Sequence, residues 1–252
     1  FVLKSSFVLS LRCSIPKEQP KIYSKSILKS MKRRIIQTSD GSTTIQIEDW
    51  DECYHSKHGA IQEAKHVFIK NGLVLFPSQN ISILEIGFGT GLNAFITFLE
   101  AKKLHQKIQY VGVEAYPVSV TELQGMNYVE ELEALEYESV FEKMHRDDWE
   151  QSIVIDEDFC LTKRQQFFEA IDDVEQYDLI YFDAFGYRVQ PDLWSTAIFQ
   201  KMYTALKNNG ILVTYAARGV VKRSMIEVGF KVEKLAGPPG KREMFRATKL
   251  VP

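Results

Sequence analysis

Hydrophobic and polar positions along the chain follow two periods, and from about residue 81 onward they predict a strand followed by a helix, repeated. Several strand candidates are continuous apolar runs, which is typical of parallel strands covered on both faces. A Gly-Pro-Pro-Gly turn joins the last two strands, so we expect a mostly parallel α/β sheet that ends in an antiparallel hairpin. The predicted strands are 81–86, 108–114, 140–144, 179–182, 210–216, 231–235 and 243–248, and the predicted helices are 92–104, 119–135, 163–172, 193–206 and 218–228.

The residues before this repeating unit follow a different pattern. Residues 31–36 and 43–47 predict the two strands of a small hairpin, and 51–72 predict a loop followed by a helix. We expect 31–252 to form one domain, in which 31–75 is an N-terminal extension.

Residues 1–30 stand apart from the rest of the chain. They contain six basic residues, one acidic residue and many serines, and the first methionine is Met31. Our hypothesis is that translation begins at Met31 and that 1–30 is upstream read-through. A disordered arm and a basic, serine-rich targeting peptide are the alternatives.

The composition narrows the class of protein. The 252 residues are 45% hydrophobic and 25% charged, which are ordinary globular values. No apolar run approaches the roughly 18–20 residues that a membrane span requires. Three cysteines without a C-x-x-C pair argue against a disulfide framework and against structural zinc, and they favour a reduced, cytoplasmic setting.

The net charge of −2 conceals a segregation of charge. Residues 114–183 contain 20 acids and 4 bases, a balance of −16, whereas 207–252 contain 10 bases and 3 acids, a balance of +7. A basic carboxyl-terminal face attracts phosphates while an acidic middle repels them, which suits a protein that docks one region of a nucleic acid. The alternative is that both are solvated surfaces.

The most informative stretch is a glycine-rich turn after the 81–86 strand. Glu85 stands two residues before the first of three glycines at alternate positions, Gly87, Gly89 and Gly91. Glycine lets the backbone turn sharply and lie close to a ligand, and the helix that follows presents free N–H groups. A dinucleotide fingerprint needs glycine at its sixth position, but that position is Leu92. A tight turn without a ligand is the alternative.

Two further acids follow predicted strands. Glu114 is placed to accept both hydroxyls of a ribose, with a solvated carboxylate as the alternative. Asp183 lies at the crevice where open α/β sheets bind ligands, with Phe185 beside it. If the acceptor is an amine, Asp183 can orient it and take up a proton, but an aspartate of ordinary pKa is a weak base, so orientation is the expected role. A helix cap is the alternative for Asp183.

Two polar segments flank this unit. Residues 51–60 include one cysteine and two histidines, but no further Cys/His pair stands at ligand spacing. We therefore expect no metal, and instead a loop that covers the cofactor or the substrate. Near the end, Lys241 and Arg242 follow the Gly-Pro-Pro-Gly turn, which would project them to grip a phosphate or an anticodon backbone. Simple solvation of both charges is the alternative.

Taken in order, these pieces resemble one family: the methyltransferase that completes 5-methylaminomethyl-2-thiouridine at the wobble position of tRNA. The glycine turn resembles motif I of class I S-adenosylmethionine (SAM) methyltransferases, in which the acid commonly faces the methionine ammonium of the cofactor. The likeness spans about residues 31–249. Its most specific stretches are Leu84-Glu-Ile-Gly-Phe-Gly-Thr-Gly-Leu-Asn93 and Phe182-Asp-Ala-Phe185 with Pro191-Asp-Leu-Trp194.

The resemblance implies a Rossmann-like class I methyltransferase fold, with SAM as cofactor and the tRNA anticodon stem-loop as partner. The methyl group would go to the primary amine of 5-aminomethyl(-2-thio)uridine 34, with Asp183 and Phe185 at the reaction centre. The resemblance places Glu85, Gly87, Phe88, Gly89, Gly91, Asn93, Glu114 and Asp183 around the cofactor, and Tyr54, Ser56, Lys222, Arg223, Lys241 and Arg242 towards the tRNA.

The sequence departs from the family in two respects. Some relatives continue into a flavin-dependent oxidase domain, but this sequence has no second glycine-rich fingerprint, so we expect no FAD and consider a separate oxidase or wobble-uridine enzyme upstream. Relatives can also place an acid near the adenine after the third strand, where Cys160-Leu-Thr-Lys163 stands here; Asp156 and Asp158 are the candidates to replace it.

Two other functions stay open. One is a small-molecule amine methyltransferase or aminopropyltransferase, which the acidic middle favours and the basic tail disfavours. The other is a non-catalytic SAM-fold module that binds RNA or a partner protein. Three intact acids, Glu85, Glu114 and Asp183, disfavour this second alternative.

Overall fold

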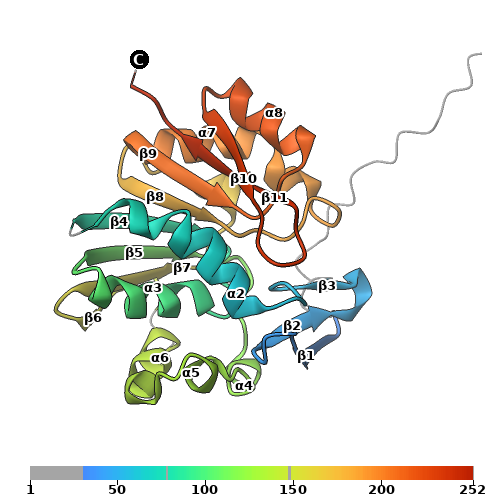
Figure 1. The fold of residues 1–252 in the computed structure, drawn as a ribbon, viewed down its shortest axis with the longest axis vertical. Helices are drawn as coiled ribbons and strands as arrows, with labels where there is room; N and C mark the ends of the chain where they lie inside the picture. Colours follow the sequence, from blue (N-terminus) through green and yellow to red (C-terminus); the bar gives the residue numbers. More distant parts are fainter. Residues whose placement is uncertain (1–30, 78, 147–148, 252) are drawn as a thin grey trace, which may run out of the picture. The chain divides into compact units, whose positions relative to one another are not determined.

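A computed structural model describes residues 31–77, 79–146 and 149–251, and the predictions for 1–30 lie outside this part of the chain. Its main element is an eight-stranded sheet (Figure 1). The strands are β4 (Asn80–Ile86), β5 (Lys107–Val113), β6 (Ser152–Asp156), β7 (Phe159–Arg164), β8 (Tyr177–Phe182), β9 (Leu206–Thr214), β10 (Lys231–Ala236) and β11 (Glu243–Thr248). They are arranged in the order β10-β11-β9-β8-β4-β5-β7-β6.

The five central strands, β9, β8, β4, β5 and β7, are parallel to one another. Strands β6, β10 and β11 pair antiparallel with their neighbours, so the predicted mostly parallel sheet with an antiparallel carboxyl-terminal hairpin is confirmed. Strand β4 pairs with β5 on one side and with β8 on the other, and the strand order reverses there. In open α/β sheets, ligands bind beyond the carboxyl ends of the strands at such a reversal.

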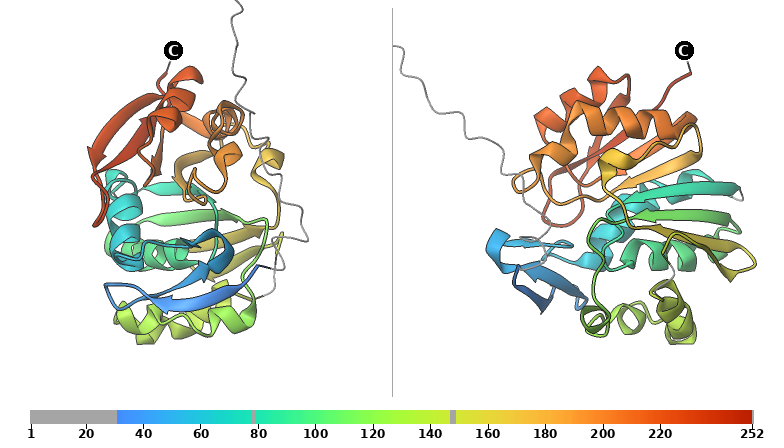
Figure 2. Two further views of the ribbon diagram at one scale, coloured as in Figure 1. Left: turned by 90° about the vertical axis from the view of Figure 1, so that its right-hand side faces the viewer. Right: turned by 180° about the vertical axis from the view of Figure 1, so that it is seen from behind.

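Helices cover both faces of this sheet (Figures 1 and 2). The helices of one face are α2 (Ala60–Ala64), its π-helical continuation (Lys65–Lys70) and α3 (Leu92–Lys103), and those of the other face are α7 (Thr196–Ala205) and α8 (Gly219–Glu227). Successive residues of β4 separate the two layers, since Ile83 packs on the α3 side whereas Leu84 and Ile86 pack on the α7 side. Burial on both faces explains why the strands are continuous apolar runs.

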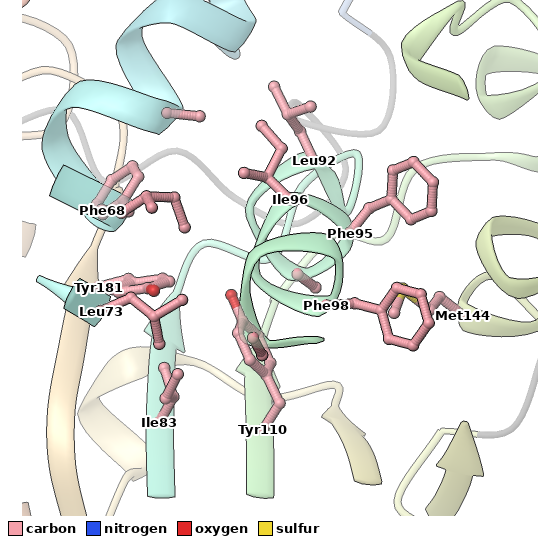
Figure 3. Packing of buried hydrophobic residues seen from close by; sticks show 14 of the residues in the cluster. Phe68, Leu73, Ile83, Leu92, Phe95, Ile96, Phe98, Tyr110, Met144 and Tyr181 are labelled. Carbon is pink, nitrogen blue, oxygen red and sulfur yellow. The ribbon is translucent and has the colours of Figure 1, made fainter. Parts of the chain in front are cut away.

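Aromatic side chains fill the layer between α3 and the sheet (Figure 3). Phe95 and Phe98 extend from α3 towards Met144, while Tyr110 of β5 and Tyr181 of β8 lie between the strands and the helix. The Tyr110 and Tyr181 rings are both fully buried, with their centroids 6.2 Å apart. The layer therefore carries the Tyr110 hydroxyl into the interior, close to the end of β4.

A small antiparallel sheet precedes the main one and is shown in blue in Figure 1. Its strands are β1 (Arg33–Gln37), β2 (Thr43–Ile47) and β3 (Glu52–Cys53), and the β1–β2 pairing confirms the predicted hairpin. Asn127 ties this sheet to the rest of the domain, because its Oδ1 accepts hydrogen bonds from the Thr43 amide (2.8 Å) and hydroxyl (3.0 Å). The loop after β3 carries Tyr54 to the glycine-rich turn.

Two predicted elements between β5 and β8 are wrong. Residues 140–144, predicted as a strand, belong to helix α6 (Glu138–Met144), in which Phe141 and Met144 stand about one turn apart and are both buried. Residues 163–172, predicted as a helix, contain the end of β7 and a short 3₁₀ turn (Phe168–Ala170). Lys163 occupies an inward-facing position of β7, so a charged residue interrupts the apolar alternation that would indicate a strand.

The predicted helix 119–135 is divided into three short pieces. These are α4 (Val120–Leu123), α5 (Tyr128–Glu131) and a 3₁₀ turn (Leu135–Tyr137). Gly125 lies in the first interruption, where glycine weakens a helix. The predicted helices 92–104, 193–206 and 218–228 are confirmed as α3, α7 and α8, with ends shifted by up to three residues. Among the described residues, none of the helices has the length and apolar character needed to cross a bilayer.

Candidate active site

The glycine-rich turn joins the carboxyl end of β4 to α3. Gly87, Gly89 and Gly91 have φ angles of +90°, +51° and +71°, in the region that favours glycine. A Cβ at Gly87 would lie 2.7 Å from the carbonyl oxygen of Asp183, and one at Gly91 would lie 2.6 Å from the ring of His145. The turn therefore requires glycine for both its conformation and its contacts, and it brings the end of β4 against the residue that follows β8.

The side chain of Phe88 packs the turn against β5. Its side chain is buried and packs against Gly112 so closely that a Cβ there would lie 2.3 Å from the ring. The amides of Gly87 and Phe88 both donate to the carbonyl oxygen of Val113, at 2.9 and 3.0 Å. Phe88 thus shapes the turn through packing.

Glu85, near the end of β4, is fully buried and held by two neutral groups. Asn93 Nδ2 donates to Glu85 Oε1 (2.8 Å), and the Tyr110 hydroxyl donates to Oε2 (2.9 Å). The same Asn93 nitrogen also donates to Asp183 Oδ2 (2.9 Å), so that one amide links two acids from adjacent strands. Within 31–77, 79–146 and 149–251, no lysine or arginine forms an ion pair with either carboxylate. Burial raises the pKa of Glu85 well above its usual range.

Asn93 also carries an unused acceptor. Its Oδ1 atom is buried and has no hydrogen-bond partner among the described residues. Leaving such an atom unsatisfied costs about 1–3 kcal/mol. Together with the carboxylates of Glu85 and Asp183, this oxygen fits a ligand that brings both N–H donors and a positive charge. An ammonium group brings both.

Glu114 directly follows β5, across the turn from Asp183. Its Oε2 accepts a hydrogen bond from the Gly89 amide (3.1 Å) and its Oε1 accepts one from the Tyr116 amide (2.9 Å). These two bonds fix the carboxylate, and each oxygen keeps a lone pair for a hydroxyl donor. Burial raises the pKa of Glu114. The position is the one predicted for a ribose contact.

Phe185 follows Asp183 and lies in an aromatic cluster. Its ring packs edge-to-face against Trp50, with centroids 5.7 Å apart, and against Tyr54, at 5.0 Å. Tyr54 also lies against the glycine turn, since a Cβ at Gly89 would be 3.1 Å from its ring. The loop after β3 thus contacts both the turn and the segment that carries Asp183.

Two hydrogen bonds hold the backbone around Asp183. The Tyr215 hydroxyl donates to the carbonyl oxygen of Ala184, and the Trp194 indole donates to that of Phe185, both at 2.8 Å. Tyr215 follows β9, and Trp194 lies in the Pro191–Trp194 turn before α7. These bonds fix the loop from two directions.

A cavity of about 480 Å³ lies next to this loop. Tyr187 and Tyr215 form aromatic parts of its wall, with Glu52 and Glu243 as its acidic residues. Its basic lining residues are Arg188, Arg218, Lys241 and Arg242. The balance of charge in the lining is therefore four positive against two negative, which favours an anionic occupant.

The residues predicted to face tRNA lie in different places. Lys241 and Arg242 line the cavity, whereas Lys222 and Arg223 lie on α8 and are not part of its wall. Ser56 lies in the loop after β3, where its hydroxyl accepts a hydrogen bond from the His58 amide at 3.2 Å. The structure therefore does not gather the six predicted residues into one site.

Of the two hairpin residues, Arg242 is exposed as predicted, but Lys241 turns inward. Its ammonium group pairs with Glu63 of α2, whose side chain is 9% exposed, and lies 3.8 Å from the centroid of the Tyr215 ring. Burial and the charge of Glu63 raise the pKa of Asp183 to about 7, while the Asn93 hydrogen bond and the charge of Lys241 oppose that increase. An aspartate with this pKa is a far better base near neutral pH than an ordinary one.

The histidines of the 51–60 segment do not form a metal site. His55 Nδ1 lies 3.1 Å from Thr44 Oγ1, and burial lowers the pKa of His55 to about 4. His58 is exposed. In the part of the chain that the structure describes, no three His, Cys, Asp or Glu side chains are grouped so that they could hold a metal ion.

The fold and the site can be compared with known proteins. Residues 136–250 match a family described as S-adenosyl-L-methionine-dependent methyltransferase. The carboxyl-terminal part of the chain is therefore similar to this methyltransferase family. The family resemblance and the class I fold expected from the sequence are both confirmed.

The relatives that this chain matches are longer proteins. The chain is 26% identical to the tRNA 5-methylaminomethyl-2-thiouridine biosynthesis bifunctional protein MnmC of Hydrogenovibrio crunogenus and 28% identical to that of Marinomonas sp., each over 210 residues. Each match covers 77% of this chain and 31% of the relative, so the chain spans about a third of their length. The crystal structure of MNMC2 from Aquifex aeolicus has the same fold, with a TM-score of 0.69 and 23% identity over 89% of this chain and 72% of that one.

Asp156 and Asp158 lie away from this site. Asp156 bonds Lys102 (2.5 Å) and Asp158 pairs with Lys107 (3.4 Å), where β5 begins. Because β7 runs parallel to β5, the start of β7 lies at the amino edge of the sheet, opposite the glycine turn. The suggestion that either acid replaces the adenine contact is therefore wrong.

Several residues of the candidate site were not identified from the sequence. Tyr110, Tyr215 and Arg218 reach it only through the tertiary fold, because nothing in their local sequence distinguishes them from core or surface residues. Glu63 had a usable signal: it stands three positions after Ala60 and four before Val67, on the buried face of the helix. An acid on an apolar helical face needs a partner, which is Lys241 here.

Proposed function

We propose that this chain transfers the methyl group of SAM to the primary amine of 5-aminomethyl(-2-thio)uridine at the wobble position of tRNA, giving 5-methylaminomethyl-2-thiouridine. The relatives named MnmC support the choice of nucleoside. The observation that carries the proposal is the place of Asp183: Asn93 links it to buried Glu85 at the glycine turn, and Gly186 and Tyr187 of the loop that follows it line a cavity with a basic lining.

In this proposal the glycine turn and its acids bind the cofactor. Glu85, Asp183 and the unused Asn93 oxygen take the methionine ammonium, and Glu114 takes the ribose hydroxyls. Bound SAM supplies a methyl group that its sulfonium charge has already activated. The protein then needs mainly to align an uncharged amine, because alignment provides much of the rate increase for such a transfer.

Asp183 acts on the acceptor. An alkyl amine with a pKa of about 10, as in lysine, is almost fully protonated at neutral pH and has no free electron pair. With a pKa of about 7, the Asp183 carboxylate can accept the proton of the ammonium ion as well as orient it. We therefore assign Asp183 the role of general base, beyond the orienting role expected from the sequence.

The cavity binds the RNA around the acceptor. Arg188, Arg218 and Arg242 suit the phosphates on either side of the modified nucleotide, and Tyr187 offers aromatic surface for a base. Sequence-specific RNA recognition favours single-stranded loops, whose bases can leave the stack. An anticodon loop provides such bases. Lys222 and Arg223, on α8, would extend the contact along the stem.

We also propose that residues 31–252 work as one catalytic unit. Its N-terminal extension, 31–75, supplies Tyr54 and Glu63 to the site. A separate oxidase or another wobble-uridine enzyme would generate the amine. We place the reaction in the cytoplasm, where thiols such as those of Cys53 and Cys160 stay reduced.

Transfer of labelled methyl groups from SAM tests the function. The acceptors are an anticodon stem-loop with 5-aminomethyl-2-thiouridine 34, the same RNA with unmodified uridine, and a polyamine. We expect label in the first RNA alone. Label in the polyamine and none in RNA would replace the proposal with small-molecule transfer. SAM binding by calorimetry without label in any acceptor would indicate a non-catalytic binding module.

A further inference from the structure

The ion pair between Glu63 and Lys241 joins two distant parts of the chain at the active site. Glu63 comes from α2 in the N-terminal extension, and Lys241 comes from the carboxyl-terminal hairpin, 178 residues later. Each partner has a second contact: Glu63 Oε2 accepts a hydrogen bond from the Ser56 amide (3.0 Å), and Lys241 lies over the ring of Tyr215. The pair is therefore held in one arrangement.

Stability alone is a weak reason for this pair. Removing two charges from water costs free energy that their attraction often fails to recover, so a buried ion pair is poor evidence of a stabilising role. A buried pair can instead fix the electrostatic environment of a neighbouring group. The neighbouring group here is Asp183, because Lys241 lies over the ring of Tyr215, whose hydroxyl donates to the carbonyl oxygen of Ala184, the residue after Asp183. The negative charge of Glu63 and the positive charge of Lys241 act on Asp183 in opposite directions.

The other groups around Asp183 are neutral or acidic. Asn93 of α3 donates a hydrogen bond to it, and Glu85 of β4 accepts one from the same amide nitrogen. The titratable and charged groups that face Asp183 from the surrounding elements are Glu63, Glu85, Tyr110, Tyr215 and Lys241. Lys241 is the one cation in this set of described residues.

We propose that Glu63 and Lys241 are positioning residues whose paired charges set the proton affinity of Asp183, so that its carboxylate can deprotonate the acceptor ammonium near neutral pH. In this step an N–H bond of the ammonium breaks, an O–H bond forms on Asp183, and the electron pair remains on nitrogen. The proton balance is complete within these two groups. The inference rests on the proposed function in that the acceptor is taken to be an amine.

The two charges act in opposite directions, and this distinguishes the proposal from a structural role. A negative neighbour disfavours a second negative charge, so loss of Glu63 should make Asp183 more acidic. Loss of Lys241 should make it less acidic. If the pair only held α2 to the hairpin, either loss would loosen the same contact, and both variants would change Asp183 in the same way.

Carboxyl carbon NMR of the full chain, without SAM or acceptor, measures the titration of Asp183 directly, with the signal assigned through Asp183→Asn. We expect Glu63→Gln to move the midpoint to lower pH and Lys241→Met to move it to higher pH, each by roughly one pH unit. The double variant should have a midpoint between those of Glu63→Gln and wild type, because the charge of Glu63 acts on Asp183 more strongly than that of Lys241. Lys241→Arg should leave the midpoint unchanged. Thermal unfolding of each variant reports whether the fold is retained.

Two substitutions in β10 are matched controls. Glu233→Gln and Lys234→Met each break an ion pair of the carboxyl-terminal hairpin, with Arg246 and with Glu243. Neither should move the Asp183 midpoint. In activity assays, the acid limb of the kcat/KM profile should follow the NMR midpoints of all variants.

The outcomes separate this inference from the proposed function. Midpoints that move in the same direction in both single variants, or do not move, would overturn the positioning role even if the enzyme methylates tRNA. Opposite shifts in a protein that leaves tRNA unlabelled would retain the electrostatic role and overturn the proposed substrate.

Discussion

The protein contains two kinds of carboxylate in its interior, and they differ in what neutralises them; Asp173 and Glu85 are buried, and Asp183 is half-buried. Asp173, which is 6% exposed, accepts hydrogen bonds from Arg164 Nη1 to both of its oxygens (3.0 and 2.8 Å) and from the Tyr177 hydroxyl (3.1 Å). Glu85 and Asp183 have an amide and a phenol as their hydrogen-bond donors. Asp173 thus has a cation of the protein as its partner, whereas the other two lack a bonded cation among the described residues.

This difference separates structure from function. A carboxylate with a bound arginine is complete, and its contribution is to the fold. A carboxylate that is buried without a cation is held in an unfavourable state, and such groups gather where a ligand supplies the missing charge or where a proton moves. The acids of the glycine turn therefore point to a cationic ligand more directly than the glycines do.

The largest expected effect comes from neutralising Asp183. Asp183→Asn keeps a group that can accept the Asn93 hydrogen bond, but it cannot take a proton from the acceptor. We expect kcat to fall by about 100-fold to 10 000-fold, the usual contribution of a general base, with the melting temperature unchanged or higher. Single-turnover methyl transfer and thermal unfolding measure both. A loss of less than about tenfold would leave Asp183 as an orienting group.

The next effect concerns the cofactor. Glu85→Gln removes the charge that we assign to the methionine ammonium, and a buried charged contact of this kind contributes about 2 kcal/mol or more, or roughly 30-fold in affinity. The apo protein should be at least as stable as wild type, because a neutral amide does not resist burial as a carboxylate does. Calorimetric titration with SAM tests the first part, with Glu233→Gln, at a half-exposed glutamate of β10, as the matched control.

Neutralising Asp173, the carboxylate paired with Arg164, should lower the stability of the fold and leave SAM affinity almost unchanged. Asp173→Asn leaves Arg164 without its anion, and we expect the free energy of unfolding to fall by about 1–3 kcal/mol, since the 25% exposed arginine side chain regains some hydration. SAM affinity should change by less than about twofold, within the ordinary effect of a distant substitution. Denaturant titration and calorimetry check the two halves. A large loss of SAM affinity would remove the distinction between the two kinds of acid.

The sequence was most informative where local chemistry dictates structure. The acid and glycines of the 85–91 turn predict a backbone that only glycine adopts, and the structure has it at those positions. The continuous apolar runs predict a parallel sheet for the same reason that they form one: both faces are buried. Glu114 and Asp183 could be placed because strand ends define the crevice.

The sequence was least informative where a side chain depends on distant partners. The glycine- and proline-rich sequence around Lys241 predicts an exposed surface lysine, but its ammonium group pairs with Glu63 on α2. Strand β7 escapes detection because buried Lys163 breaks its apolar alternation. In both cases the residue type indicates exposure and the tertiary fold overrides it, which no local pattern can show.

The smallest expected effect is the dependence of catalysis and stability on pH. Asp183 accepts a proton only as a carboxylate, and with a pKa of about 7 it is about 9% ionised at pH 6 and about 91% at pH 8. The value of kcat/KM should therefore rise about tenfold between these two pH values.

The stability of the fold should change with pH in the opposite direction. The unfolded aspartate has a pKa of about 3.9, so between pH 3.9 and pH 7 the folded state binds more protons than the unfolded state. Each rise in pH within this range therefore favours unfolding. In Asp183→Asn, the acid limb of residual activity should therefore disappear and the stability profile should flatten between pH 4 and 7, whereas Asp173→Asn should retain both features. Rate profiles and denaturant titrations across this range measure the two slopes, and an acid limb that persists without Asp183 would assign the titrating base to another group.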